Sequence, residues 1–226
     1  MPEHAGRMAA AEAEVKGGRR RHAIRSFLAS LAWRMSSGTL RVGITLGGRS
    51  MVYLVRQGQT DWNLFRKFNG VTDTLLNQTG IAQAKLQAEN LRSVSFDACF
   101  CSPQKRARQT CEIIYKGPIV LDDRLAEVNC GEFEGTDETA DAMKLFLQAT
   151  SNGSKGTEGS KEFINRNCDF CDMIMEDHKG KNVLIVTHSG NARVINYYFN
   201  GKPEHYDFSR SVVKNGGLLT FENSGI

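Results

Sequence analysis

Side chains that bind oxyanions follow two of the most apolar stretches of the sequence. Arg56, Gln57 and Asn63 come just after the run MVYLV, in the segment LVRQGQTDWN. His188 and Arg193 come just after the run VLIVT. Guanidinium groups donate paired hydrogen bonds that match phosphoryl oxygens, and an imidazole or backbone N–H groups add further hydrogen bonds. If these segments meet in the fold, they form a site suited to a phosphoryl dianion.

A third group of polar residues opens a predicted helix. Ser102, Arg106 and Arg108 lie in CSPQKRARQT, directly after the apolar run FDACF. A single arginine is most often a solvated surface charge, and Arg66 and Arg108 fit that interpretation. A lone histidine after a strand is also often only a hydrogen-bonded surface group. The combination of such residues at three strand ends is what favours a phosphoryl-binding site.

The elements that must position these groups follow from the hydrophobic pattern. Thr79 and Ser102 are the expected N-caps of two helices, with Pro103 at the first helical position of the second. Strands alternate with helices, so the fold class is α/β, with a mostly parallel sheet covered on both faces. Ligands of such sheets bind beyond the carboxyl ends of the strands. The expected strands are 51–55, 96–100, 118–122, 183–187 and 217–222. The expected helices are 80–91, 103–114, 138–149, about 161–177, and one that is entered through HSGNAR and ends near Asn200.

Four segments, in order, resemble the signatures of the histidine phosphatase superfamily, whose fold is also called phosphoglycerate mutase-like. They are LVRQGQTDWN, CSPQKRARQT, LAEVNCGEFEG and VTHSGNAR. The family patterns are R-H-G-x-T-x-x-N, S-P-x-x-R-A-x-Q-T, L-x-E-x-x-x-G-x-x-E-G and T-H-x-G-x-x-R. The likeness runs through residues 51–226 and does not include residues 1–50. It implies a three-layer α/β/α sandwich that binds a phosphomonoester.

The resemblance also implies roles for individual side chains. Arg56, Arg106 and His188 would bind the phosphoryl group, with Asn63 assisting. Glu127 would be the general acid that protonates the departing alkoxide. The family's nucleophile is a histidine that accepts the phosphoryl group covalently.

At the position of that nucleophile this sequence has Gln57. A carboxamide nitrogen has its lone pair delocalised into the carbonyl, whereas a neutral imidazole keeps a basic lone pair. Gln57 still offers a hydrogen-bond donor, so ligand binding is expected to outlast turnover. His188 does not replace the nucleophile, because the resemblance makes it a phosphate-binding group that is useful when protonated. We expect phosphatase activity to be lower by on the order of 10³-fold than with histidine at this position.

Three interpretations of function stay open. The chain is a phosphatase scaffold impaired at Gln57, a non-catalytic pseudophosphatase that binds a phosphorylated ligand or partner protein, or an unrelated α/β protein. A phosphatase is favoured over a mutase, because only about 25 residues separate Gly135 from the helix at Lys161. The segment TEGSKEF resembles a bend in short bacterial phosphatases that act on α-ribazole phosphate. Residues 136–160 carry no feature that identifies the substrate.

Composition bears on the other classes of function. No apolar run approaches the ~18 residues that span a bilayer, so a soluble, cytoplasmic protein is expected. The net charge of +4 comes from residues 1–50, which hold 9 Lys+Arg and 3 Asp+Glu. The remainder is nearly neutral, which argues against nucleic-acid binding. We expect no membrane partner, no cofactor and no metal; the partner is a small phosphorylated molecule, and the oligomeric state is not indicated.

Residues 1–50 differ from the rest of the chain. From Lys16 to Ser50 there is no acidic residue, while arginine recurs. This pattern is typical of an organelle-targeting presequence, and also of vector-derived sequence, with Met51 as the natural start. We expect a disordered extension outside the core, with targeting as the alternative.

The six cysteines are expected to be free thiols, since nothing indicates export. Cys168 and Cys171 have the C-x-x-C spacing of some zinc and redox sites. They have no second ligand pair and fall in an expected helix. Two thiols on a helix face are therefore the favoured interpretation.

Overall fold

A computed structural model describes residues 50–201 and 213–223 of the chain. These residues build a five-stranded sheet in the order β3-β2-β4-β1-β5. Neighbouring strands pair in parallel, except that β5 is antiparallel to β1. The strands are β1 (Met51–Arg56), β2 (Ala98–Cys101), β3 (Val120–Leu121), β4 (Val183–Thr187) and β5 (Leu218–Glu222).

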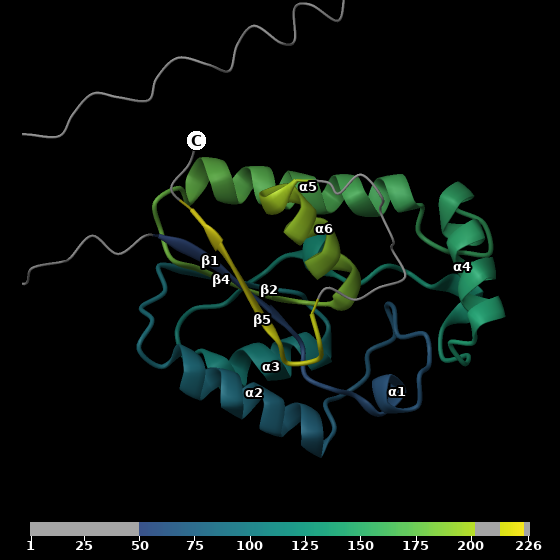
Figure 1. Ribbon diagram of the computed structural model, residues 1–226, viewed down its shortest axis with the longest axis horizontal. Helices are drawn as coiled ribbons and strands as arrows, with labels where there is room; N and C mark the ends of the chain where they lie inside the picture. Colours follow the sequence, from purple (N-terminus) through teal and green to yellow (C-terminus); the bar gives the residue numbers. More distant parts are fainter. Residues whose placement is uncertain (1–49, 202–212, 224–226) are drawn as a thin grey trace, which may run out of the picture. The chain divides into compact units, whose positions relative to one another are not determined.

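Helices cover both faces of this sheet. Figure 1 shows α5 and α6 on one face and α2 and α3 on the other. The expected three-layer α/β/α sandwich with a mostly parallel sheet is therefore confirmed. The helices are α1 (Asp61–Leu64), α2 (Gln78–Leu91), α3 (Lys105–Ile114), α4 (Ala140–Asn152), α5 (Ser160–Asp177) and α6 (Ser189–Asn200).

Both predicted N-caps are wrong. Helix α2 is capped by Asn77, whose side chain accepts a hydrogen bond from the N–H of Gly80 at 2.9 Å. Helix α3 begins only at Lys105 with Gln104 as N-cap, so Pro103 lies outside it. Asparagine caps a helix at least as well as threonine, and the Ser102 hydroxyl is hydrogen-bonded to a histidine instead.

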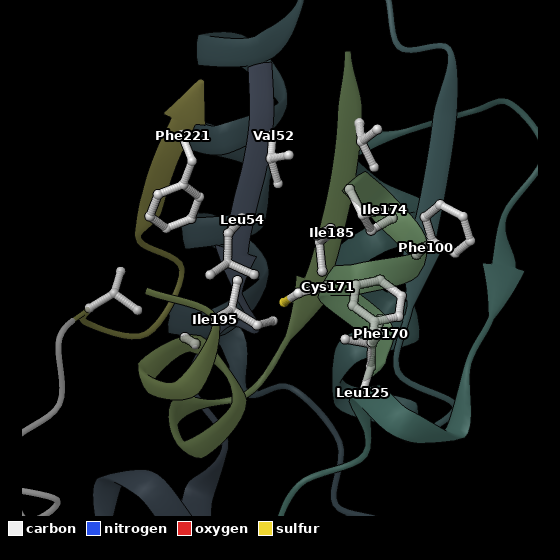
Figure 2. Packing of buried hydrophobic residues seen from close by; sticks show 13 residues of the cluster. Val52, Leu54, Phe100, Leu125, Phe170, Cys171, Ile174, Ile185, Ile195 and Phe221 are labelled. Carbon is white, nitrogen blue, oxygen red and sulfur yellow. The ribbon is translucent and has the colours of Figure 1, made fainter. Parts of the chain in front are cut away.

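The core has two parts because side chains alternate along each strand. On one face, Val52, Leu54 and Ile185 pack against apolar side chains of α5 and α6, including Phe170 and Ile195 (Figure 2). On the other face, strand residues pack against α2 and α3. This second cluster consists of Val55, Leu91, Cys99, Cys101, Ala107, Cys111, Leu184 and Val186.

All six cysteines are free thiols, as expected. Cys168 and Cys171 both lie on α5, where Cys171 is completely buried in the core. Of the expected extension 1–50, only Ser50 lies within the described residues. Its carbonyl accepts a hydrogen bond from the N–H of Asn223. No described helix has the length and apolar character needed to cross a membrane.

Candidate active site

Three adjacent strands bring the predicted site segments to one edge of the sheet. Arg56 at the end of β1 is in register with Thr187 at the end of β4. The N–H of Gln57 donates to the carbonyl of Thr187 at 2.8 Å. The N–H of Ser102, which follows β2, donates to Val186 at 3.0 Å. The residues after β1, β2 and β4 are therefore neighbours, as the parallel arrangement predicts.

The turn after β1 is packed directly against the start of α2. A Cβ atom on Gly58 would lie 2.4 Å from the carbonyl oxygen of Gly80. The N–H of Gly58 donates to the Thr110 hydroxyl of α3 at 3.1 Å. Glycine is required at position 58 because of this close approach. The contacts of Gly58 with α2 and α3 fix the turn that carries Gln57.

A cavity of about 610 Å³ opens at this edge. Four of the six predicted site residues line it: Arg56, Gln57, Asn63 and Glu127. The other two, Arg106 and His188, are buried and are not among its lining residues.

Arg106 is tied to the loop that follows α1. Its Nη1 donates to the carbonyl of Thr72 at 2.9 Å, and its Nη2 donates to those of Gly70 at 2.7 Å and Asn69 at 3.2 Å. Its Nε has no hydrogen-bond partner among the described residues. Burial lowers the pKa of Arg106, while the nearby charge of Glu127 acts in the opposite direction. In this structure the guanidinium positions the loop.

His188 is completely buried. Its Nε2 lies 2.7 Å from the Ser102 hydroxyl, and its Nδ1 has no partner among the described residues. Burial, together with the positive charges of Arg106 and Arg56, holds the pKa of His188 well below its ordinary value of 6.5. The ring is therefore neutral at neutral pH. This differs from the expectation of a protonated imidazole, because burial and two cations both disfavour the charged form.

The Glu127 carboxylate lies at the N-terminus of α6. Its Oε2 accepts a hydrogen bond from the N–H of Gly190 at 3.1 Å, and its Oε1 accepts from the N–H of Val128 at 3.0 Å. A Cβ atom on Gly190 would lie 2.4 Å from Oε1. A Cβ atom at this place in the helix would push the carboxylate, which faces the cavity, out of its present position.

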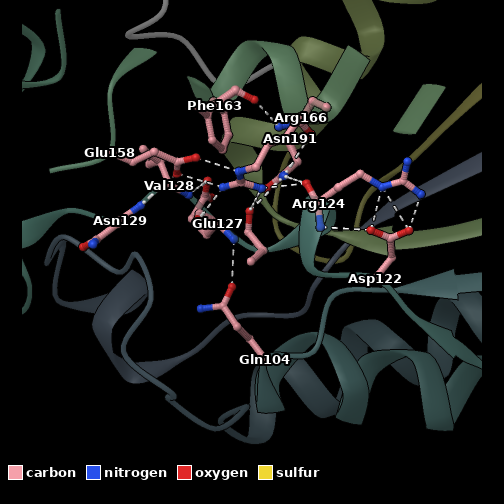
Figure 3. Close-up of polar contacts among 12 residues, drawn as sticks. Gln104, Asp122, Arg124, Glu127, Val128, Asn129, Glu158, Phe163, Arg166 and Asn191 are labelled. Atoms are coloured by element: carbon pink, nitrogen blue, oxygen red, sulfur yellow. Dashed lines mark hydrogen bonds and ion pairs between the residues drawn. The ribbon is translucent and has the colours of Figure 1, made fainter. Parts of the chain in front are cut away.

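The backbone around Glu127 is held by α5. Arg166 donates from Nη1 to the carbonyls of Arg124 and Ala126 at 2.6 and 2.7 Å, and from Nη2 to that of Glu127 at 3.3 Å (Figure 3). The same guanidinium forms two hydrogen bonds with the Glu158 carboxylate, at 2.7 and 2.9 Å. Sequence reasoning missed this network, whose only signal was a charged pair eight residues apart.

Asn191 bonds the same segment as Arg166, and Asn167 in turn bonds Asn191. The Nδ2 of Asn191 donates to the carbonyl of Ala126 at 3.0 Å and to Oδ1 of Asn167 at 2.9 Å. Both asparagines are completely buried. The hydrogen bonds from Asn191 Nδ2 therefore favour this arrangement of the segment that carries Glu127, while Asn191 Oδ1 has no partner among the described residues.

Asn63 belongs to the capping box of α1. Its N–H donates to the Thr60 hydroxyl at 3.2 Å, and its Oδ1 accepts from the N–H of Thr60 at 3.1 Å. Oδ1 also accepts from Nδ2 of Asn215 at 3.0 Å. With its oxygen occupied in this way, Asn63 has only its NH₂ group left as a polar group at the wall of the cavity.

Gln57 is 3% exposed, and its amide oxygen has no hydrogen-bond partner among the described residues. Its main chain is fully engaged, since its carbonyl accepts from the N–H of Gly216 at 3.0 Å. Buried polar atoms in native proteins are nearly always paired, and exceptions often mark functional sites. Among the predicted site residues, Gln57, Arg106 and His188 each carry such an atom; among the other described residues, His178, Asn191 and Asn223 do so as well.

The part of the cavity lining that comes from α4 was also not predicted from the sequence. One face of α4 lines it, with Met143, Phe146, Leu147 and Thr150, and Glu138 lies beside them. These α4 positions have helical spacing, so they form one stripe. No pattern within the sequence indicated that this stripe faces the predicted site.

A comparison with protein families decides the relationship. The profile of the histidine phosphatase superfamily (branch 1) matches residues 52–224. The chain belongs to the histidine phosphatase superfamily. The Shigella flexneri α-ribazole phosphatase, a solved structure, superposes with a TM-score of 0.66 and 25% identity, over 75% of this chain and 89% of that chain.

Curated members of the superfamily are also similar in sequence. A Schizosaccharomyces pombe protein named a probable phosphatase is 34% identical over 76% of this chain and 83% of its own length. An Arabidopsis thaliana metal-independent phosphoserine phosphatase is 31% identical over 64% of this chain and 66% of its own length. The superfamily resemblance noted in the sequence is confirmed.

Proposed function

We propose that the cavity binds a small phosphomonoester and that Gln57 makes this chain a strongly impaired phosphatase. The observation that carries the proposal is the unpaired buried amide oxygen of Gln57 at the wall of a cavity that Arg56 and Glu127 also line. A phosphoryl group bound there would meet the Arg56 guanidinium. An amide rotated by half a turn would offer its NH₂ group to a phosphoryl oxygen, since its two ends are nearly isosteric.

A histidine at position 57 would supply the missing step. Its ring nitrogen would form a bond to phosphorus while the bond from phosphorus to the ester oxygen breaks. The Glu127 carboxyl group would give its proton to the departing alkoxide. Water would then attack the phosphohistidine and release inorganic phosphate. Gln57 cannot begin this sequence, so only slow attack by water on the bound ester is left.

The second candidate function is a pseudophosphatase that binds a phosphorylated ligand or partner protein without hydrolysing it. Gln57 itself favours this candidate, since its amide can still form a hydrogen bond with a phosphoryl oxygen but cannot act as a nucleophile. The two candidates share the binding site and differ only in residual hydrolysis. Tight ligand binding with no detectable product would identify the pseudophosphatase.

The phosphoryl site is tested by titrating the full chain with inorganic phosphate and with orthovanadate in a calorimeter. We expect both to bind, and Arg56→Met to weaken binding by about tenfold or more, as for a hydrogen bond from a charged donor. Arg108→Met is the matched control, because Arg108 is an exposed arginine on α3 that pairs only loosely with Glu112. No binding, or equal losses in both variants, would contradict the site.

A further inference from the structure

The lining of the cavity combines polar and apolar side chains. Arg56, Gln57 and Glu127 are among the polar ones. Helix α4 contributes lining residues at the spacing i, i+3, i+4 and i+7, and neighbouring segments add further apolar side chains. These apolar lining residues are Phe68, Val128, Met143, Phe146, Leu147 and Phe163.

Three phenylalanine rings hold α4 in this position. Phe68 lies 5.0 Å from Phe146 and 5.6 Å from Phe133, measured between ring centroids, and Phe133 lies 5.6 Å from Phe146. Such tilted and edge-on contacts are favourable beyond the area that they bury. Phe68 is 2% exposed. The apolar wall is therefore a packed part of the domain that a ligand meets already formed.

The charges that line the cavity leave no surplus for a second anion. Two arginines, Arg56 and Arg193, face two carboxylates, Glu127 and Glu138. Glu138 interacts electrostatically with both Arg56 and Glu127, and burial raises its pKa. A phosphoryl dianion at Arg56 already makes the cavity negative. A further carboxylate or phosphate on the ligand would add to this charge beside Glu138.

We propose that the phosphomonoester taken by this site has an uncharged, apolar organic group, aryl or alkyl, and that Glu138 selects against esters with a second anionic group. This inference rests on the proposed phosphoryl site and names the class of ligand that the site accepts. Burial of apolar surface favours binding of the organic group. Repulsion from the Glu138 charge weakens binding of esters that carry a second anionic group.

The test uses two ligands that differ by one carboxylate, phenyl phosphate and 4-carboxyphenyl phosphate, titrated into the full chain beside inorganic phosphate. We expect phenyl phosphate to bind about tenfold more tightly than inorganic phosphate, from burial of its ring. We expect 4-carboxyphenyl phosphate to bind about tenfold more weakly than phenyl phosphate, from one nearby like charge.

Two pairs of variants assign these differences to residues. Glu138→Gln should reduce the ratio of the Kd values of the two aryl phosphates by about threefold or more. Asp141→Asn, at an exposed acid in the first turn of α4, should leave this ratio unchanged. Leu147→Ser should weaken phenyl phosphate by about threefold or more. Leu145→Ser, at an exposed leucine that does not line the cavity, should have no such effect.

The outcomes separate this inference from the proposed function. If neither inorganic phosphate nor orthovanadate binds, the phosphoryl site itself is wrong. If inorganic phosphate binds but phenyl phosphate gains nothing, or 4-carboxyphenyl phosphate binds as well as phenyl phosphate, only the ligand class is overturned. Equal effects of Glu138→Gln and Asp141→Asn would overturn the role of Glu138.

Discussion

The pair Arg166 and Glu158 is predicted to hold the segment that carries Glu127, and replacing either residue tests this. Arg166 donates to three backbone carbonyls of residues 124–127 and forms two hydrogen bonds with Glu158. The two side chains are only 21% and 15% exposed. Water therefore screens the pair much less than it screens an ion pair on the surface.

The expected magnitude follows from these contacts. Removing one partner of a buried charge pair costs about 3–5 kcal/mol, and since this pair keeps some exposure we expect Arg166→Met to lower the free energy of unfolding by about 3 kcal/mol. Glu158→Gln keeps one hydrogen-bond acceptor and loses the charge, so about 1–2 kcal/mol is expected. Because both remove the same interaction, the double variant should lose about 1–2 kcal/mol less than the sum.

Denaturant unfolding of the full chain measures these differences. Arg92→Met is the control, since Arg92 pairs with Glu89 at an exposed site, where side chains are 76% and 66% exposed. Such a pair contributes less than about 1 kcal/mol. In the Gln57→His background, Arg166→Met should also lower kcat more than it weakens binding of inorganic phosphate. A loss of stability no larger than that of Arg92→Met, or additive losses in the double variant, would refute the reasoning.

Three further predictions concern the site itself. In the Gln57→His background, Gly190→Ala should lower kcat by about tenfold or more, because the added Cβ displaces the Glu127 carboxylate. An unchanged kcat would show that turnover does not depend on this position of the carboxylate. Gln57→Met removes a buried oxygen that has no partner and should raise the free energy of unfolding by about 1 kcal/mol in a denaturant titration; a loss of stability would show that this oxygen is satisfied. The pKa of His188 is lowered in the folded chain, so the unfolded chain binds more protons below about pH 6.5 and stability falls as the pH drops, by up to about 1.4 kcal/mol per pH unit. His188→Asn should make that pH dependence shallower, and an unchanged slope would contradict the lowered pKa.

Local patterns predicted much of the fold. Short apolar runs that alternate with amphipathic helices were enough to predict the five strands of the described residues and the order of the main helices. The placement of Gln57 and His188 at the same edge of the sheet followed from its parallel strands, whereas the direct pairing of β1 with β4 was not predicted. Helix starts were less well predicted, because a threonine and a serine near the true starts were also plausible caps. Asn77 and Gln104 took these positions instead.

The site was predicted less completely than the fold. Which carbonyl acceptors Arg106 donates to depends on where the loop 69–72 lies, and that is set by tertiary packing. The neutral state of His188 depends on burial and on arginines from other elements. The contacts of α4 with the cavity and those of Arg166 join segments that lie far apart along the chain. The spacing of residues within one segment cannot predict such long-range contacts.

The most direct test of the central claim is the rate at position 57. Purified full-length chain and its Gln57→His variant are compared with p-nitrophenyl phosphate under the same conditions. We predict that the variant hydrolyses the ester on the order of 10³-fold faster and forms a phosphohistidine that the unaltered chain does not form. Equal rates, or a phosphorylated intermediate on the unaltered chain, would contradict the account.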